Sequence, residues 1–242
     1  MEKKNSQTIK GDNNTQNITY NVGIQRDEVI NIIKNYCYTD KEQIIDIIKE
    51  VMDSIEKENG RMPEKRIFIP ILQQLSVSLD DECIKQTYKQ LLKSSMSSNK
   101  NVHPSFVTIV NQLNSDEIKI LNSLPPVTIH YMPLLNVRLK NGIQKGDGIM
   151  IIRNFSNVGF GVCDNPENIG LYIDNLERLK LIEIPPFKTL LNKEAYQKLK
   201  EHPNVVETIN RNGAALPSIN IEYDERCFLL TQFGVEFIEA CK

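Results

Sequence analysis

The sequence predicts a mainly α-helical protein with an N-terminal strand-forming tail, a multi-helix domain and a C-terminal winged-helix-like α+β domain. Three observations support this prediction. Apolar residues recur at spacings of three and four over residues 44–55, the period of an amphipathic helix. A double proline at 125–126 separates helix-like sequence from segments rich in β-branched residues. Polar and apolar residues alternate over 17–22, the period of a strand.

The predicted tail covers residues 1–25 and has the pattern of a small hairpin. A first strand is expected over 8–10, a tight turn over 11–14 and a second strand after it. Asparagine and glutamine side chains in such a segment can form ladders between identical chains, which favours self-association. The candidate residues for this contact are Asn13, Asn14, Gln16, Asn17, Ile18, Tyr20 and Val22. A flexible or locally docked tail is the alternative, because chain termini are usually poorly ordered.

The second predicted domain, residues 26–124, is all-helical. We expect helices over 26–38, from about 40 to 57, from Pro63 onward, over 78–96, from 103 and from 114. Pro70 should kink or interrupt the third of these helices, because proline lacks the N–H that a helix interior needs. The sequence NSDE at 114–117 has the pattern of a helix N-terminal cap.

The third predicted domain, residues 125–242, mixes strands and helices. Strands are expected over 127–131, 149–155, 181–184 and 221–230, and helices over 168–180, 192–202 and 232–241, with a loop over 211–220. Apart from the helix over 192–202, the order from residue 168 onward is helix, short strand, loop, strand and closing helix. That order is the one a winged-helix module needs, with 168–180 as its recognition helix.

Three cationic side chains near this helix are the candidate contacts for DNA or a protein partner: Arg178, Lys180 and Lys188. Glu177 and Glu183 lie among them, and such mixing of charge weakens a DNA-facing surface. A winged helix used for protein contacts is therefore favoured over one used for DNA, and both remain open.

Composition excludes several classes of protein. The formal net charge of −2 gives no overall attraction to nucleic acid. The five cysteines are scattered and contain no CxxC pair, which argues against a disulfide framework or a zinc site. No apolar window is long enough for a membrane span. We expect a cytoplasmic bacterial protein with no membrane span.

Residues suited to catalysis do not form a recognisable motif. The three histidines, His103, His130 and His202, are far apart and lack metal-ligand spacing. Acidic pairs such as 116–117 lie at helix starts, where they complement the helix dipole. The glycine-bearing loops match no nucleotide-binding pattern. We therefore predict no catalytic, cofactor-binding or metal-binding residue, and the balance leans against an enzyme.

Several short motifs together resemble the Abi-alpha family, bacterial proteins named for abortive infection, a response to phage. The resemblance is carried by PIL at 70–72, LLKSSM at 91–96, HPSF at 103–106, QLNSDEIKIL at 112–121, LTQFG at 230–234 and FIEAC at 237–241. The resemblance implies a defence-associated protein with no established catalytic residues.

Three functions follow as hypotheses. The first is a non-enzymatic anti-phage defence component that acts by protein–protein association, with self-assembly through the tail as one route. The second is a winged-helix DNA-binding regulator. The third is a toxin-like enzyme acting on nucleic acid or a nucleotide, which would need His103 or His130 to meet acidic residues in a pocket.

Overall fold

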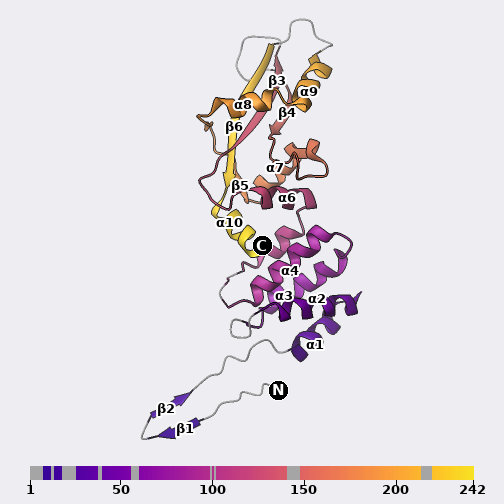
Figure 1. Cartoon of the computed structure of the whole chain (residues 1–242), viewed down its shortest axis with the longest axis vertical. Helices are drawn as coiled ribbons and strands as arrows, with labels where there is room; N and C mark the ends of the chain where they lie inside the picture. Colours follow the sequence, from indigo (N-terminus) through magenta and orange to yellow (C-terminus); the bar gives the residue numbers. More distant parts are fainter. Residues whose placement is uncertain are drawn as a thin grey trace. The chain divides into compact units, whose positions relative to one another are not determined.

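A computed structural model describes most of the chain. The described residues are 8–11, 14–17, 26–37, 40–55, 60–98, 100, 102–140, 148–213 and 220–242. The chain divides into two compact units, one of residues 1–80 with 88–107 and the other of residues 81–87 with 108–242. Figure 1 labels the elements of both units, which are described separately below.

The tail contains a short antiparallel hairpin whose first strand lies where it was expected. Its second strand starts inside the predicted turn, at residue 14, and residues 18–22 of the predicted second strand lie outside the described residues. Strand β1 (Thr8–Gly11) pairs with β2 (Asn14–Asn17), so that Thr8 lies opposite Asn17. Of the candidate self-association residues, Asn14, Gln16 and Asn17 lie on β2. The other four, Asn13, Ile18, Tyr20 and Val22, lie outside the described residues.

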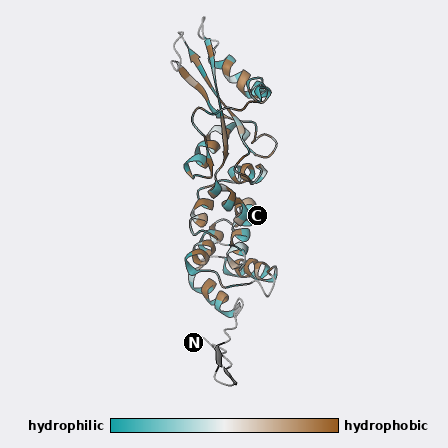
Figure 2. Cartoon of the chain, turned by 90° about the vertical axis from the view of Figure 1, so that its left-hand side faces the viewer, coloured by the Kyte–Doolittle hydropathy of each residue, from teal (hydrophilic) through white to brown (hydrophobic). Residues whose placement is uncertain are grey.

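The first unit is built on amphipathic helices that bury their apolar faces against one another. Its helices are α1 (Arg26–Tyr36), α2 (Lys41–Asp53) and α3 (Lys65–Val77), together with the later part of α4 (Glu82–Met96). Figure 2 shows the alternation of hydrophobic and hydrophilic residues along these helices. The core includes Ile33, Ile44, Ile48, Phe68, Leu72, Leu75, Tyr88 and Leu91, all at most 1% exposed.

The predicted interruption at Pro70 is wrong, because α3 runs through it as one helix. Pro70 is the sixth residue of α3, so it removes the hydrogen bond that an N–H there would donate to the previous turn, and its ring crowds the carbonyl of that turn. The flanking apolar residues Phe68, Ile71 and Leu72 are fully buried. Their burial outweighs the loss of one backbone hydrogen bond.

The second unit contains a four-stranded antiparallel sheet with strand order β4-β3-β6-β5. The strands are β3 (Met132–Lys140), β4 (Ile149–Phe155), β5 (Ile182–Glu183) and β6 (Asn220–Leu230). The strand predicted over 127–131 is wrong, since those residues precede β3 and contain a turn. The prediction also missed the central strand β3, although residues 135–140 alternate apolar and polar as a half-buried strand does.

Four helices contact this sheet: α7 (Ile169–Arg178), α8 (Lys193–Lys200), α9 (Pro203–Gly213) and α10 (Gln232–Cys241). Helix α6 (Ser115–Ser123) contacts α7, and a 3-10 turn at Pro166–Asn168 leads into α7. Helix α5 (Ser105–Val110) has residues in both units. Helix α9 was not predicted, and the loop expected over 211–220 is wrong at both ends. Residues 211–213 belong to α9, residue 220 begins β6, and 214–219 lie outside the described residues. Pro203 begins α9, consistent with the preference of proline for the first helical position.

The segment LTQFG joins the end of β6 to α10. It holds the start of α10 against the residues that follow α7. Thr231 caps α10 by accepting a hydrogen bond from the Gly234 N–H, and its hydroxyl donates to the Lys180 carbonyl at 2.6 Å. A Cβ at Gly234 would lie only 2.0 Å from the Leu181 carbonyl oxygen, so the close approach requires glycine. The threonine and the glycine of this motif are therefore both required by the structure.

Candidate functional site

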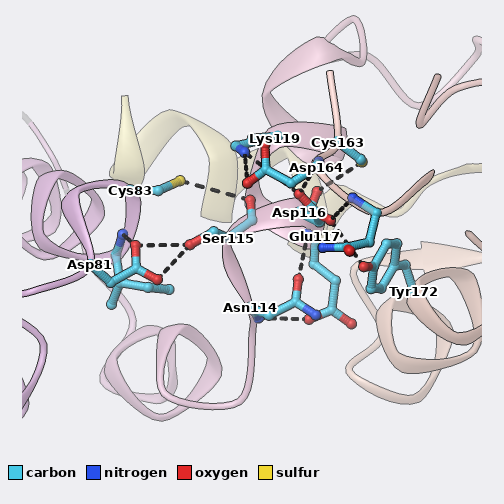
Figure 3. A network of polar contacts seen from close by, with 12 residues as sticks. Asp81, Cys83, Asn114, Ser115, Asp116, Glu117, Lys119, Cys163, Asp164 and Tyr172 are labelled. Atoms are coloured by element: carbon cyan, nitrogen blue, oxygen red, sulfur yellow. Dashed lines mark hydrogen bonds and ion pairs between the residues drawn. The ribbon is translucent and has the colours of Figure 1, made fainter. Parts of the chain in front are cut away.

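The acidic residues at the start of α6 form a polar network, shown in Figure 3. The Asn114 side chain accepts a hydrogen bond from the Glu117 N–H at 2.9 Å, and the Glu117 carboxylate accepts one from the Asn114 N–H at 2.8 Å. This reciprocal pair is a capping box, which satisfies two backbone donors that the helix cannot use. The expected cap at 114–117 is confirmed.

Asp116, the neighbour of Glu117, binds a distant loop instead. Its carboxylate accepts hydrogen bonds from the backbone N–H groups of Asp164 and Asn165 and from the Tyr172 hydroxyl, at 2.8, 2.9 and 3.0 Å. Burial opposes ionisation, but these donors and the nearby Lys119 ammonium hold the Asp116 pKa below its usual range. The charged carboxylate is thus a structural link between α6 and the segment that leads into α7.

Burial dominates at Glu117 and raises its pKa, despite hydrogen bonds from the Asn114 N–H and the Asn175 side chain. Neighbouring carboxylates with opposite pKa shifts are a feature of some acid–base sites. Here, however, the donors to both groups are structural, and neither carboxylate lines the cavities described below. The network is best explained as a joint in the fold.

Two cysteines, Cys37 and Cys163, were tested as possible nucleophiles, and both are held as thiols. Burial and the Asp116 carboxylate raise the Cys163 pKa to about 11, and its sulfur lies 3.6 Å from the Asp116 carbonyl oxygen. Burial also raises the pKa of Cys37. Thiols with raised pKa values are weak nucleophiles at neutral pH.

Two of the three histidines have local structural roles. The Nδ1 atom of His103 lies 2.7 Å from the Ser105 hydroxyl and accepts a bond from the Ser105 N–H at the start of α5. The ring of His202 packs between Phe155 and Phe160, with centroid distances of 5.1 and 4.3 Å. Burial lowers the His202 pKa, which favours its neutral form.

The third histidine, His130, lines an open cavity of about 670 Å³ in the second unit. Tyr131, Asn157, Lys188, Leu191 and Lys198 are among its other lining residues. The lining residues identified in the described chain include no carboxylate. The structure thus does not bring His130 to an acidic partner in this cavity.

Lys188 and Tyr131 form the polar centre of the cavity. The Lys188 ammonium lies 2.5 Å from the Tyr131 hydroxyl oxygen and 4.1 Å from the centroid of its ring. These two distances place the ammonium at the hydroxyl end of the ring. Because lysine can only donate, the tyrosine oxygen accepts this bond and its own proton stays available to another acceptor.

Three large apolar residues lie at this cavity or next to it in the chain: Leu191 lines it, Phe187 precedes Lys188, and Ile129 precedes His130. Phe187 and Leu191 are fully exposed, and Ile129 is 81% exposed. Phe187 also has a φ of 59°, in the left-handed region that a bulky residue adopts only at a cost. We call these three residues, together with the cavity, the Phe187 surface.

The loop that carries Phe187 and Leu191 is anchored by buried groups. The Tyr196 hydroxyl accepts a hydrogen bond from the Leu190 N–H and donates one to the Arg226 carbonyl, both at 2.8 Å. The buried Cys227 thiol donates to the Lys188 carbonyl, with the sulfur 3.5 Å from the oxygen. The apolar side chains are therefore displayed by a loop tied to β6.

A second cavity, of about 390 Å³, lies beside β4, α7 and α9. Its two arginines are each close to a carboxylate, Arg153 to Asp174 at 3.6 Å and Arg211 to Glu207 at 3.7 Å. The larger cavity likewise has one lysine, Lys198, beside a carboxylate, but its second lysine, Lys188, has no ion pair among the described residues. The Phe187 surface is therefore the stronger candidate site.

The three predicted basic residues have different environments. Arg178 donates hydrogen bonds to the side chains of Asn175 and Gln112. Lys180 is exposed at the end of α7 with a φ of 61°. Among the three, Lys188 alone lines the larger cavity.

The sequence did not identify Tyr131, Phe187 or Leu191 as site residues. A usable signal was present in PPFKTLLN at 185–192, where apolar residues follow a double proline without the periodicity of a helix or strand. Apolar residues in a segment with no buried face are candidates for exposure.

Comparison with known proteins identifies the family. The model of the family described as abortive infection alpha matches residues 39–241. The chain belongs to the abortive infection alpha family. The resemblance based on the short motifs is thereby confirmed. Two of these motifs have structural roles described above: QLNSDEIKIL contains Asp116, which binds the segment before α7, and LTQFG contains Gly234, which lies against Leu181.

No curated protein matches the chain. One similar solved structure is an uncharacterized protein from the hydrocarbon-degrading marine bacterium Alcanivorax borkumensis SK2. It shares 18% sequence identity, with 58% of this chain and 97% of that chain covered. Its TM-score of 0.38 is too low to support an argument about fold or function.

Within the described part of the chain, no helix is both long enough and apolar enough to cross a membrane. The same residues contain no group of three or more histidine, cysteine, aspartate or glutamate side chains placed to hold a metal ion.

Proposed function

We propose that this member of the abortive infection alpha family is a non-enzymatic component of an anti-phage response, and that it acts by protein–protein association through the Phe187 surface. Membership of the family supports the defence role. The single observation that supports association is the exposure of Leu191, which lines the cavity, together with Phe187 and Ile129, which directly precede lining residues in the chain.

The exposed apolar residues of the Phe187 surface are close in the chain to residues that line one cavity. Single exposed apolar residues are normal on protein surfaces, whereas apolar residues grouped around a concave site are typical of interaction surfaces. A large aromatic side chain is a common anchor of binding energy. The left-handed backbone at Phe187 adds a conformational cost to a side chain that gains nothing from burial within the chain.

Phage challenge of bacteria that express the protein tests this proposal. The double variant Phe187→Asn with Leu191→Ser removes both apolar anchors, and asparagine tolerates a positive φ better than most other residues with a side chain. We expect phage plaque counts to rise to those of cells without the protein. Val77→Ser, at an apolar residue 76% exposed in the first unit, is the matched control and should keep protection.

The proposal fails if the folded double variant protects fully. It also fails if the unaltered protein protects against none of a broad phage panel. Circular dichroism before the challenge distinguishes loss of association from loss of folding.

The tail supplies a second proposed contact, between copies of the chain. The β1–β2 hairpin forms a two-stranded sheet, so each strand has an outer edge not paired within that sheet. Such edges can pair with another chain. Asn14, Gln16 and Asn17 on β2, with Asn13, Ile18, Tyr20 and Val22, remain the proposed self-association residues.

A DNA-binding regulator remains the alternative role for Arg178, Lys180 and Lys188. The order α7, β5, β6, α10 is that of the predicted winged helix, although α8 and α9 lie between β5 and β6 in the sequence. A salt-sensitive gel shift that is lost in Arg178→Ala and Lys180→Ala would favour it.

A further inference from the structure

The donor groups of the Phe187 surface point to the chemistry of its partner. The Lys188 ammonium uses one of its three N–H groups on Tyr131, and the Tyr131 hydroxyl has its proton available. The Asn192 side-chain oxygen accepts a bond from the Glu194 N–H, which leaves its amide N–H groups as donors. The polar centre of this cavity is thus rich in donors.

The charge of the cavity has the same sign. Lys188 and Lys198 both line it, and the lining residues identified in the described chain include no carboxylate. Lys198 is offset by Glu194, 2.9 Å away in an exposed pair. The Tyr131 hydroxyl raises the Lys188 pKa, with a smaller contribution from the Glu183 carboxylate, so the ammonium stays charged at neutral pH. Lys188 is therefore the lining cation that has no ion pair among the described residues, and it is the charge offered to a partner.

The apolar residues restrict the kind of anion. A free inorganic anion would use the donors and leave Phe187 and Leu191 uncovered. A nucleic-acid strand would need a longer series of cations, and this cavity has two lysines. An acidic peptide segment with a large apolar side chain satisfies both parts of the surface, because its carboxylate meets the donors and its apolar group covers the anchors.

We propose that the Phe187 surface binds a segment of a partner protein in which glutamate or aspartate flanks a large apolar residue. The partner carboxylate is placed between Lys188 and the Tyr131 hydroxyl, and the apolar side chain packs on Phe187 and Leu191. This inference rests on the proposed function, since it specifies the partner of the same surface.

Fluorescence anisotropy with the full-length chain tests the inference. The probe is a short fluorescein-labelled peptide in which glutamates flank a phenylalanine and a leucine. One control peptide has lysine in place of glutamate, and another has serine in place of the two apolar residues. We expect the acidic apolar peptide to bind at least about tenfold more tightly than either control, and to bind more weakly as salt is added.

Variants locate the binding on the surface. Lys188→Met should weaken binding of the acidic peptide about tenfold, as expected for loss of one charge-assisted contact, and Lys188→Arg should restore part of it. Phe187→Asn should weaken it without changing the salt dependence. Lys65→Met, at an exposed lysine on α3, should have no effect.

Three results would overturn the inference: no binding of the acidic peptide, equal binding of the acidic and basic peptides, or binding unaffected by Lys188→Met. Displacement of the labelled acidic peptide by a DNA duplex would also overturn it. Phage challenge with Lys188→Met separates the two proposals. If the apolar double variant loses protection and Lys188→Met keeps it, association at this surface stands and the acidic partner does not. If both variants keep protection, both proposals fail.

Discussion

Asp116 and Glu117 are adjacent in the sequence, yet their pKa values move in opposite directions. Both carboxylates are at most 5% exposed, so burial penalises ionisation at each. Asp116 overcomes this penalty because two backbone N–H groups and the Tyr172 hydroxyl donate to it. The difference lies in the donors supplied by residues some 50 positions later in the chain.

This difference predicts an acid-dependent loss of stability. A carboxylate with a lowered pKa stabilises the fold above its ordinary value of 3.8 and loses that contribution as pH falls through the folded pKa. Asp116→Asn should lower the unfolding free energy at neutral pH by about 1–3 kcal/mol, since buried donors lose a charged acceptor. Its stability should also depend less on pH below about 4.

Urea unfolding at several pH values measures both effects. Glu117→Gln is the matched control, because the raised pKa of Glu117 contributes with the opposite sign: stability present at low pH and lost as pH rises through the folded pKa. Identical pH profiles for Asp116→Asn and the unaltered chain would refute the assignment.

A second residue-scale prediction concerns Tyr196. Tyr196→Phe would leave the Leu190 N–H without its acceptor and the Arg226 carbonyl without its donor, at a cost of about 1–3 kcal/mol. The unfolding free energy measures this cost, and Tyr223→Phe on β6 is a comparison in a more exposed position. Equal stability of the two variants would show that the loop is not anchored by this hydroxyl.

At the scale of elements, Lys180, which was predicted to contact DNA or a partner, has a structural role at the end of α7. The Leu181 N–H bonds to the Leu176 carbonyl, and the Lys180 N–H bonds to the Glu177 carbonyl. This pair of bonds is a Schellman motif, whose left-handed position is usually glycine. Lys180 fills that position with a φ of 61°.

Lys180→Gly should therefore stabilise the protein by up to about 1 kcal/mol, because relief of left-handed strain exceeds the entropy cost of glycine. Lys180→Ala retains Cβ and should give no gain. Thermal and urea unfolding of both variants measure the difference. A less stable Lys180→Gly would show that the lysine side chain contributes contacts of its own.

The opposite change at Gly234 should be harmful. Gly234→Ala would place Cβ 2.0 Å from the Leu181 carbonyl oxygen, which forces the start of α10 away from the chain after α7. We expect a loss of about 1–3 kcal/mol, the usual cost of overpacking. Glu236→Ala, at an exposed position of the same helix, controls for helix propensity, and an equal effect would contradict the close approach.

Local sequence predicted elements where the signal lies within a few residues. The start of α6 was predicted because Asn114 and Glu117 are three residues apart, which suits a reciprocal cap. Helix α9 and strand β3 were missed although their local patterns are present. Val205, Val206 and Ile209 follow Pro203 at helical spacing, and residues 135–140 alternate apolar and polar.

At the scale of the whole molecule, the tail makes a separate prediction about assembly. Light scattering should give a larger mass for the full chain than for residues 26–242, if the hairpin edges pair between copies. Asn14 and Gln16 replaced together by lysine should reduce the mass, because like charges oppose strand pairing. Equal masses for the full and shortened chains would remove tail-mediated assembly.

The sequence alone determined the family, the amphipathic helices, the cap of α6 and the first strand of the tail hairpin, because each depends on residue types at short spacing. Tertiary structure decided which polar and apolar side chains stay exposed and can contact a partner. Lys188 and Tyr131 are 57 residues apart, and their contact, with Phe187 and Leu191 exposed beside it, depends on the packing of distant segments. Burial is a property of that packing, so the site became visible only in the folded chain.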